Sequence, residues 1–411
     1  MALKDRLAPF RIAQFRNLWF SDALSLSGFE METLILAWYV LQESNSPFLV
    51  GVIGALRFGG TLVSPFLGVY VDRLSKQSVI LWFRVAFLLV SLGVMTAAFT
   101  GTLELWQAFV AAAVQGLLRP PEMVVRQALI ADSVPANLLM NAMGFSRINL
   151  DGAKIVGALT GAGTMAAFGI GNAYLIVSVV YAASLVFTLR MNVIPPAAPA
   201  DGDSAWMQLR AGLAHIRAIP PLNGLMWLAF VANLVAYPVS YGLLPVIARD
   251  EFNLDELGLA NMVVAVSVGA LIGSVVLGFV RTRRPSMMMV LGVFLWQFTL
   301  LAFALSPGYT LAMVMLFFSG LASSIGMTSM SVMLMLYANP AYRGRVMGVR
   351  MLAVYGLPLG LLVAGYLFEQ MGVRGTLTLM GAGGLVVFIW QLLRWRRIAE
   401  RYEREQGMPP E

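Results

Sequence analysis

The chain has 411 residues, of which 59% are hydrophobic and 12% charged, and it carries a net charge of +7. A soluble domain has about 25% charged residues, so this composition excludes a water-soluble protein and indicates mostly lipid surroundings. The chain has no cysteine, which excludes disulfides and thiolate metal sites, and its single histidine, His215, cannot form a histidine metal site. We therefore expect no bound metal and no cofactor.

Apolar stretches long enough for a membrane helix, which needs about 20 residues, recur along the whole chain. They are too long and continuous for the alternating strands of a β-barrel. The predicted fold is an all-α polytopic membrane protein with twelve transmembrane helices in two pseudo-symmetric six-helix bundles. The predicted spans are residues 17–41, 48–71, 78–100, 104–128, 139–167, 172–192, 222–247, 257–280, 286–306, 309–337, 346–369 and 374–395.

One long polar interruption, residues 195–221, divides the chain. Pro, Gly and Asp open it, and an amphipathic stretch from Trp206 to Ile216 follows. His215 lies in this stretch, where an ordinary interfacial side chain is favoured over a proton relay. We expect a bundle over 1–194, a cytoplasmic linker with an amphipathic helix over 195–221, a second bundle over 222–395 and a basic cytoplasmic tail over 396–411. Short internal matches, such as Arg73 with Arg283 at an offset of 210, support two related halves.

The distribution of Lys and Arg predicts the orientation. With the N-terminus inside, the outside loops hold only Arg249 and Arg374, whereas the inside segments hold most of the remaining basic residues. Both termini are therefore expected in the cytoplasm, with the chain spanning the inner (plasma) membrane many times. This asymmetry explains the positive charge, so we expect lipid and not nucleic acid as the partner surface.

Ionisable residues also lie inside the predicted spans, where each costs at least ~2.5–3.5 kcal/mol and is a candidate functional group. Most are in the N-terminal half. The proton or substrate candidates are Asp22, Glu30, Glu32, Arg57, Arg119, Glu122, Asp151 and Lys154, with Arg126 close to them.

Helical spacing sorts these candidates. Arg119 and Glu122, Glu122 and Arg126, and Asp151 and Lys154 are three or four residues apart, which favours structural ion pairs within one helix. Glu30 and Glu32 point about 160° apart at ~100° per residue. One of them is expected to pair with Arg57 and the other to face the central path, and the angles leave open which is which. Asp22 and this glutamate pair are the candidates for binding a proton or a cationic substrate.

The stretch "GVYVDRLSKQ", residues 68–77, places three charges between two long apolar runs. It resembles the signature of the major facilitator superfamily between its second and third helices, with Gly68, Asp72 and Arg73 matching and Lys76 keeping the charge. The resemblance implies a cytoplasmic gate that latches the two halves when the transporter opens outward. In such a gate Asp72 faces the helix that begins near Arg345, and Arg73 or Lys76 pairs with Asp132.

Two further stretches, "SNSPFLVG" and "RGRVMG", are similar to the drug:proton antiporter branch that includes macrolide and enterobactin exporters. This resemblance covers essentially the whole chain. It implies efflux of amphipathic small molecules of the drug or siderophore class, coupled to protons, by alternating access. We therefore expect a role in multidrug resistance. The expected partners are the small-molecule substrate and protons, and a monomer is the favoured oligomeric state.

Other functions stay open on the same fold. Arg57, Arg119 and Lys154 would suit an anionic headgroup or a catecholate, as in a lysophospholipid, metal or organic-anion carrier. A transport-silent membrane receptor is a further alternative. The sequence contains neither a phosphate-binding Gly-rich loop with Lys-Ser or Lys-Thr nor a histidine-based triad at the needed depth, so we do not expect an enzyme or an ATP-driven pump.

Overall fold

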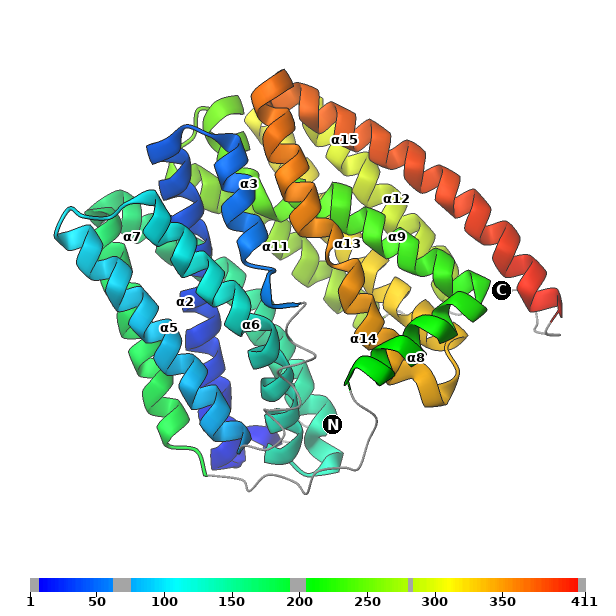
Figure 1. The fold of residues 1–411 in the computed structure, drawn as a ribbon, viewed down its shortest axis with the longest axis horizontal. Helices are drawn as coiled ribbons and strands as arrows, with labels where there is room; N and C mark the ends of the chain where they lie inside the picture. The colour runs from blue at the N-terminus through cyan, green and yellow to red at the C-terminus, as the bar shows by residue number, and fades with distance from the viewer. Residues whose placement is uncertain (1–6, 62–74, 193–204, 280–283, 406–411) are drawn as a thin grey trace. The chain divides into compact units, whose positions relative to one another are not determined.

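The computed structural model describes residues 7–61, 75–192, 205–279 and 284–405 (Figure 1). Within these ranges every regular element is a helix and no strand is present. Eight helical segments are long and apolar enough to cross a membrane. The fold class predicted from the sequence is therefore confirmed.

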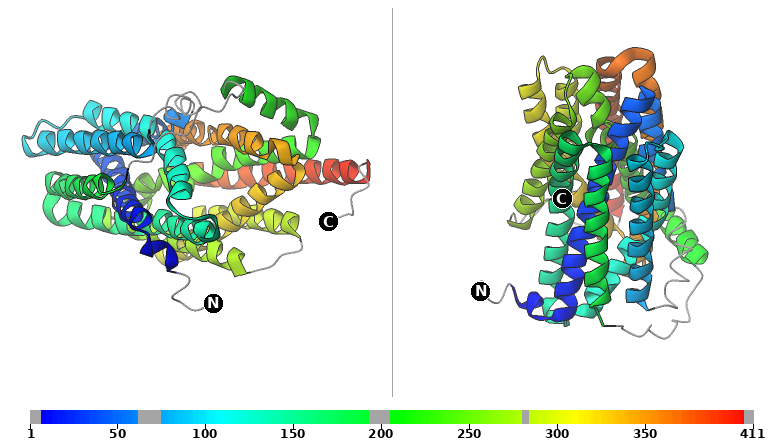
Figure 2. Two further views of the ribbon diagram at one scale, coloured as in Figure 1. Left: turned by 90° about the horizontal axis from the view of Figure 1, so that it is seen from below. Right: turned by 90° about the vertical axis from the view of Figure 1, so that its left-hand side faces the viewer.

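The chain divides into two compact units, which we call unit 1 and unit 2. In unit 1, α2 packs along α7, and α5 packs against both α6 and α7 (Figure 2). Apolar side chains from α2, α5 and α6, among them Phe15, Ile80 and Leu129, form a buried cluster at one end of this unit. Unit 1 contains residues Met1–Asn45, Leu56–Gly202 and Asp255–Ala260, with η1 (Ala8–Arg11), α2 (Ala13–Ser44), α5 (Lys76–Phe99), α6 (Leu105–Ser133), η2 (Ala136–Leu138) and α7 (Leu139–Leu189).

Unit 2 is built mainly on the α12–α13 pair and on α9 packed against α15. Its buried core includes Leu225, Met330 and Trp395. The unit contains residues Ser46–Ala55, Asp203–Leu254 and Asn261–Glu411. Its elements, with α11 shared with unit 1, are α3 (Pro47–Leu56), α8 (Ala205–Ala218), α9 (Pro220–Tyr237), η3 (Pro238–Gly242), α10 (Leu244–Val246), η4 (Ile247–Glu251), α11 (Glu256–Phe279), α12 (Pro285–Ala304), α13 (Tyr309–Tyr337), η5 (Pro340–Tyr342), α14 (Arg343–Ala353) and α15 (Gly356–Glu405).

Two of the long segments each contain two membrane spans. The helix α7 is interrupted at Gly169 and α15 at Gly372, where φ is 76° and 72°. Backbone with positive φ is accessible to glycine at little cost, so one residue is enough to redirect the chain. Counting both parts of these two segments, and adding the short α3 and the charged α6, the described residues hold the twelve segments expected from the sequence.

The helix α3 differs from its predicted place. The expected second span, 48–71, belongs to the N-terminal bundle, whereas residues 46–55 group with unit 2 and residues 62–74 are outside the described ranges. Glu369 on α15 explains the grouping, because its carboxylate accepts hydrogen bonds from Ser46 Oγ at 2.5 Å and from the Phe48 amide at 3.2 Å. The start of α3 is thereby fixed to α15.

The predicted linker and tail both have helical parts. The helix α8 covers the amphipathic stretch from Trp206 to Ile216 and packs on α14. Residues 396–405 of the predicted basic tail continue α15 as helix.

A close approach at Gly116 gives a test of the packing in unit 1. A Cβ at this position would meet the Leu56 carbonyl oxygen at 2.2 Å and Arg57 Cα at 2.6 Å, and these are backbone atoms. We expect Gly116→Ala to destabilise the protein by about 1–3 kcal/mol, because backbone has to shift. Gly93, with nothing within 4 Å of its Cβ position, is the control. Equal melting temperatures of the purified G116A and G93A proteins in detergent would contradict this packing.

Candidate functional site

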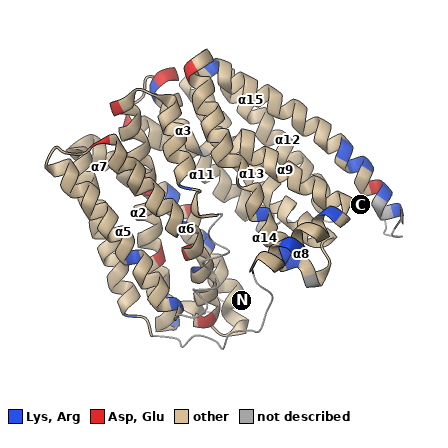
Figure 3. Ribbon diagram, viewed as in Figure 1, with Lys and Arg blue, Asp and Glu red and all other residues tan. Residues whose placement is uncertain are grey.

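Charged residues occur inside three helices of unit 1. Figure 3 shows basic and acidic residues along α2, α5 and α6, within otherwise uncharged helix surfaces. Five of them contact one another and are called the charge network here: Asp22, Arg84, Arg119, Glu122 and Arg126. All five are buried, with exposed fractions from 0% to 7%.

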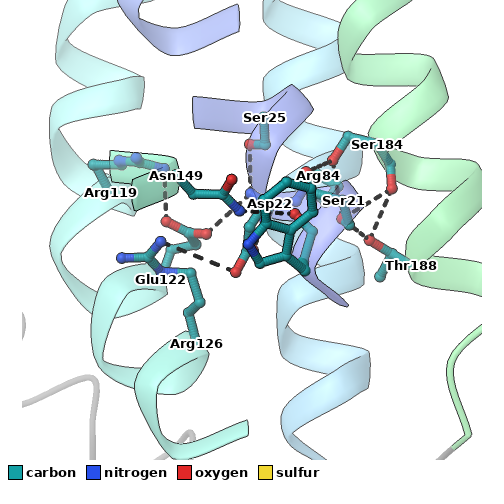
Figure 4. Close-up of polar contacts among 11 residues, drawn as sticks. Ser21, Asp22, Ser25, Arg84, Arg119, Glu122, Arg126, Asn149, Ser184 and Thr188 are labelled. Carbon is teal, nitrogen blue, oxygen red and sulfur yellow. Dashed lines mark hydrogen bonds and ion pairs between the residues drawn. The ribbon is translucent and has the colours of Figure 1, made fainter. Parts of the chain in front are cut away.

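Arg84 on α5 is the centre of the charge network (Figure 4). Its Nη2 lies 2.8 Å from Asp22 Oδ1 on α2, and its Nη1 lies 3.0 Å from Glu122 Oε1 on α6. Nη1 also donates to Ser25 Oγ at 2.5 Å. One guanidinium therefore contacts two carboxylates and ties together three helices.

The other two arginines are held differently. Arg119 Nη1 lies 2.8 Å from Glu122 Oε2, which confirms the predicted pair within α6. The predicted pair of Glu122 with Arg126 is wrong: the described residues contain no ion pair between them, and the two oxygens of Glu122 contact Arg84 and Arg119. The nearest carboxylate oxygen to Arg126 is instead Asp22 Oδ2, at 4.0 Å from Nη1.

Hydroxyl and amide groups hold α2 in place beside Asp22 (Figure 4). Ser21 Oγ donates to the Ser184 carbonyl at 3.0 Å and lies 2.7 Å from Thr188 Oγ1, both on α7. Asn149, also on α7, donates from Nδ2 to the Trp19 carbonyl at 2.9 Å. These contacts fix the register of α2 against α7, so the position of Asp22 does not depend on its ion pairs alone.

Glu32 forms a second polar centre, ten residues farther along α2. Its Oε2 accepts hydrogen bonds from the Tyr181 hydroxyl, at 2.6 Å, and from Gln115 Nε2. Its Oε1 is buried without a hydrogen-bond partner, and no ion pair to Glu32 is present in the described part of the chain. Unlike Asp22 and Glu122, this carboxyl group is held only by neutral donors.

The predicted pairing of Arg57 with Glu30 or Glu32 is wrong. Arg57 donates instead to Thr33 Oγ1 and, from Nη2, to the Glu32 main-chain carbonyl at 3.1 Å. Its guanidinium carbon also lies 5.3 Å from the centre of the Phe29 ring, a cation–π distance. Glu30 is half-buried and lies at the α2–α7 contact, since a Cβ on Gly157 would meet Glu30 Cβ at 2.6 Å.

Two further predicted pairs have different outcomes. Asp151 Oδ2 lies 2.8 Å from Nε of Arg147, one turn earlier on α7, a partner that the sequence analysis did not name. The pairing of Asp151 with Lys154 stays a prediction. Lys76 Nζ lies 2.5 Å from Asp132 Oδ2, one of the two pairings expected there. The remaining gate residues Gly68, Asp72 and Arg73 lie outside the described residues.

Sequence reasoning missed three arginines with polar partners: Arg84, Arg147 and Arg350, the last of which donates to Ser331 Oγ at 2.5 Å. Arg84 had a usable signal. It is the only charged residue in the predicted span 78–100, six residues from the inside end, and Asp22 is five residues from the inside end of span 17–41. A buried arginine and a buried carboxylate at equal depth predict an ion pair.

The sequence model of the family described as "Transmembrane secretion effector" matches residues 4–408. The chain belongs to the transmembrane secretion effector family. It is a membrane transporter of the major facilitator type, as its fold also indicates. Comparison with curated protein sequences gives no match.

Solved transporter structures share the fold of this chain at low sequence identity. The nucleoside transporter NupG superposes with a TM-score of 0.73 at 15% identity, over 94% of this chain and 98% of that one. A bacterial homologue of the human lysosomal transporter Spinster gives 0.71 at 14%, over 96% and 98%. The human organic anion transporter MFSD10 gives 0.65 at 14%, over 92% and 99%. These likenesses concern the fold alone.

The charge network predicts a large effect of removing its central cation. Arg84→Met leaves Asp22 and Glu122 buried without this partner, so we expect about 3–5 kcal/mol of destabilisation. Arg404→Met, which breaks a pair of two exposed side chains, Arg404 and Glu400, should cost less than about 1 kcal/mol. Melting temperatures of the purified variants measure both.

A compensating variant tests the cause. Adding Asp22→Asn to Arg84→Met removes the carboxylate that lost its close arginine contact and keeps the Arg119–Glu122 pair. This double variant should therefore recover part of the lost stability, which a double-mutant cycle measures as a coupling energy. A double variant no more stable than Arg84→Met would show that Arg84 acts through packing and not through its charge.

Proposed function

We propose that this transporter is a proton-coupled exporter of amphipathic small molecules, working by alternating access, and that Glu32 carries the coupled proton. The observation that supports the proposal is the environment of Glu32. It is a fully buried carboxyl group in a membrane helix whose described partners are a tyrosine hydroxyl and a glutamine amide. Asp22 and Glu122 have arginine partners instead and suit a structural role.

A proton carrier must be stable in both protonation states at different stages of the cycle. A carboxyl group away from water and cations is stable when it carries a proton, and it ionises when a cation or water reaches it. Oε1 of Glu32 has no hydrogen-bond partner and is the free position for that proton. A proton can therefore bind at Oε1 without disturbing the two hydrogen bonds to Oε2.

Arg57 is the cation that stabilises the ionised state in this proposal. Its guanidinium already donates to the Glu32 main-chain carbonyl and to Thr33 Oγ1. When Glu32 releases its proton, Arg57 turns from these oxygens to the carboxylate. Breaking the contact with Thr33 changes how residue 57 is held against α2, which links the proton to a movement of the helices.

The proposed orientation follows the basic residues, with both termini in the cytoplasm of a cell whose inner (plasma) membrane the chain spans. In that orientation Lys76 and Asp132 lie at the cytoplasmic ends of α5 and α6. Together with Gly68, Asp72 and Arg73 they form the proposed cytoplasmic gate.

The role of Glu32 is tested in proteoliposomes that contain a pH-sensitive dye, with ethidium, erythromycin and 2,3-dihydroxybenzoate as transported probes. For at least one probe, the wild type should move protons opposite to the probe. Glu32→Gln should lose this proton movement, because its amide cannot release a proton, while Glu43→Gln, at the exposed end of the same helix, should keep it.

Three outcomes would contradict this proposal. Equal proton movement in wild type and Glu32→Gln removes Glu32 from the role, and a loss confined to Glu30→Gln assigns it to Glu30. Flux of the probes that is indifferent to the pH gradient indicates a carrier without proton coupling. Binding of a probe without flux indicates a receptor.

The gate proposal predicts that the Lys76–Asp132 pair affects transport more than stability. Both side chains are about one-third exposed, so Asp132→Asn should cost less than about 1 kcal/mol while changing the transport rate at least about fivefold. The exchange Lys76→Asp with Asp132→Lys should restore the rate. The control is Glu251→Gln, which breaks another pair with an exposed arginine, Arg374. If the exchange of Lys76 and Asp132 does not restore the transport rate, the gate proposal is contradicted.

A further inference from the structure

The charge network contains more basic than acidic groups. Among the described residues, Arg84, Arg119 and Arg126 contact two carboxylates, those of Asp22 and Glu122. Arginine stays protonated in proteins, so with both acids ionised the network has one positive charge in excess. An uncompensated charge away from water is costly, and an anion that binds there would lower that cost.

The excess is located at Arg126. Its side chain is only 4% exposed, yet Nε and Nη1 have no hydrogen-bond partner in the part of the chain that the structure describes. In contrast, Arg119 makes a 2.8 Å contact with Glu122, and both Nη groups of Arg84 contact carboxylates, although its Nε is also unpartnered. A buried donor without a partner costs about 1–3 kcal/mol. Arg126 thus has unused donors at the place where negative charge is lacking.

We propose that Arg126 binds an oxyanion, a carboxylate or phosphate group, carried on the transported molecule. A guanidinium is planar and can contact such a group with two parallel hydrogen bonds. The two acids beside Arg126 do not prevent this, because Glu122 has both oxygens on Arg84 and Arg119, and Asp22 has its closer contact with Arg84. Figure 4 shows the Arg126 guanidinium beside these two carboxylates, at the edge of the network.

Arg126 suits this role better than the arginines that the sequence suggested for an anion. Arg57 is engaged by Thr33 and a main-chain carbonyl, and Arg119 is engaged by Glu122. Only the assignment of the oxyanion to a transported molecule rests on the proposed function.

The proposed anion site and the proposed proton site are separate. Asp22, beside Arg126, and Glu32 are ten residues apart on α2, about 15 Å at 1.5 Å per residue. The anion and the proton are therefore coupled through the conformation of the protein and do not compete for one place.

The test measures binding without any gradient, so it does not depend on proton coupling. The full chain in neutral detergent is titrated with benzoate and with inorganic phosphate at constant ionic strength, with chloride as reference, and its melting temperature is followed. At least one of the two should raise the melting temperature of the wild type with a saturating dose dependence. Arg126→Gln should weaken this response at least about tenfold in concentration, and Arg190→Gln, a change of an exposed arginine of the same unit, should leave it unchanged.

Two more variants keep the test decisive if Arg126→Gln does not fold. Arg126→Lys keeps the charge but loses the planar fork, and should weaken binding less than Arg126→Gln. Asp22→Asn increases the excess positive charge and should tighten binding. An unchanged response in Arg126→Lys and Asp22→Asn, or no response of the wild type to either anion, would overturn the proposal.

A lipid headgroup offers the same phosphate chemistry from another source. Measurements in nanodiscs of phosphatidylglycerol and of phosphatidylcholine distinguish a bound lipid headgroup from an anion on a transported molecule. Stabilisation by phosphatidylglycerol that depends on Arg126, without any by benzoate or inorganic phosphate, would place a lipid at the site and overturn the assignment to a transported molecule. Equal stability in both lipids, with a response to the soluble anions, supports it.

Discussion

The contact of Arg84 with two carboxylates is the interaction on which unit 1 depends. A guanidinium enclosed by helices in lipid is costly, and anions at hydrogen-bond distance offset that cost. Asp22 and Glu122 supply them from α2 and α6, so three helices have to keep their depth and rotation relative to one another. The serine and threonine contacts between α2 and α7 maintain the same register independently.

The two polar centres of α2 divide the chemistry between them. Around Asp22 the acids are saturated with arginine, which gives a rigid centre with a surplus of positive charge on Arg126. Around Glu32 the donors are neutral, so its charge is free to change. In the proposed mechanism the first centre recognises an anionic group and the second responds to protons. A helix that carries both connects the two events.

The sequence was sufficient for the fold because lipid imposes a simple rule. Long apolar runs can only be helices there, so the spans followed from hydropathy. For Arg119, Glu122 was the one carboxylate in reach within the helix, and this pair was predicted correctly. Pairing was harder to predict where several partners competed for one carboxylate. Glu122 had Arg84 from another helix as well as Arg126, and Asp151 had Arg147 as well as Lys154. Contacts between helices depend on rotation about the helix axis, which hydropathy does not fix, and this is why Arg57 was misassigned and Arg126 was not recognised as the unsatisfied cation.

The glycines that interrupt α7 and α15 have a consequence for how the protein is made. Gly169 and Gly372 redirect the chain with almost no intervening loop. The two spans on either side are consequently too closely joined to enter the bilayer one at a time with a hydrophilic stop between them. Each pair should pass from the ribosome into the membrane as a preformed helical hairpin, and little of either tip is left for proteases or antibodies on the far side of the membrane.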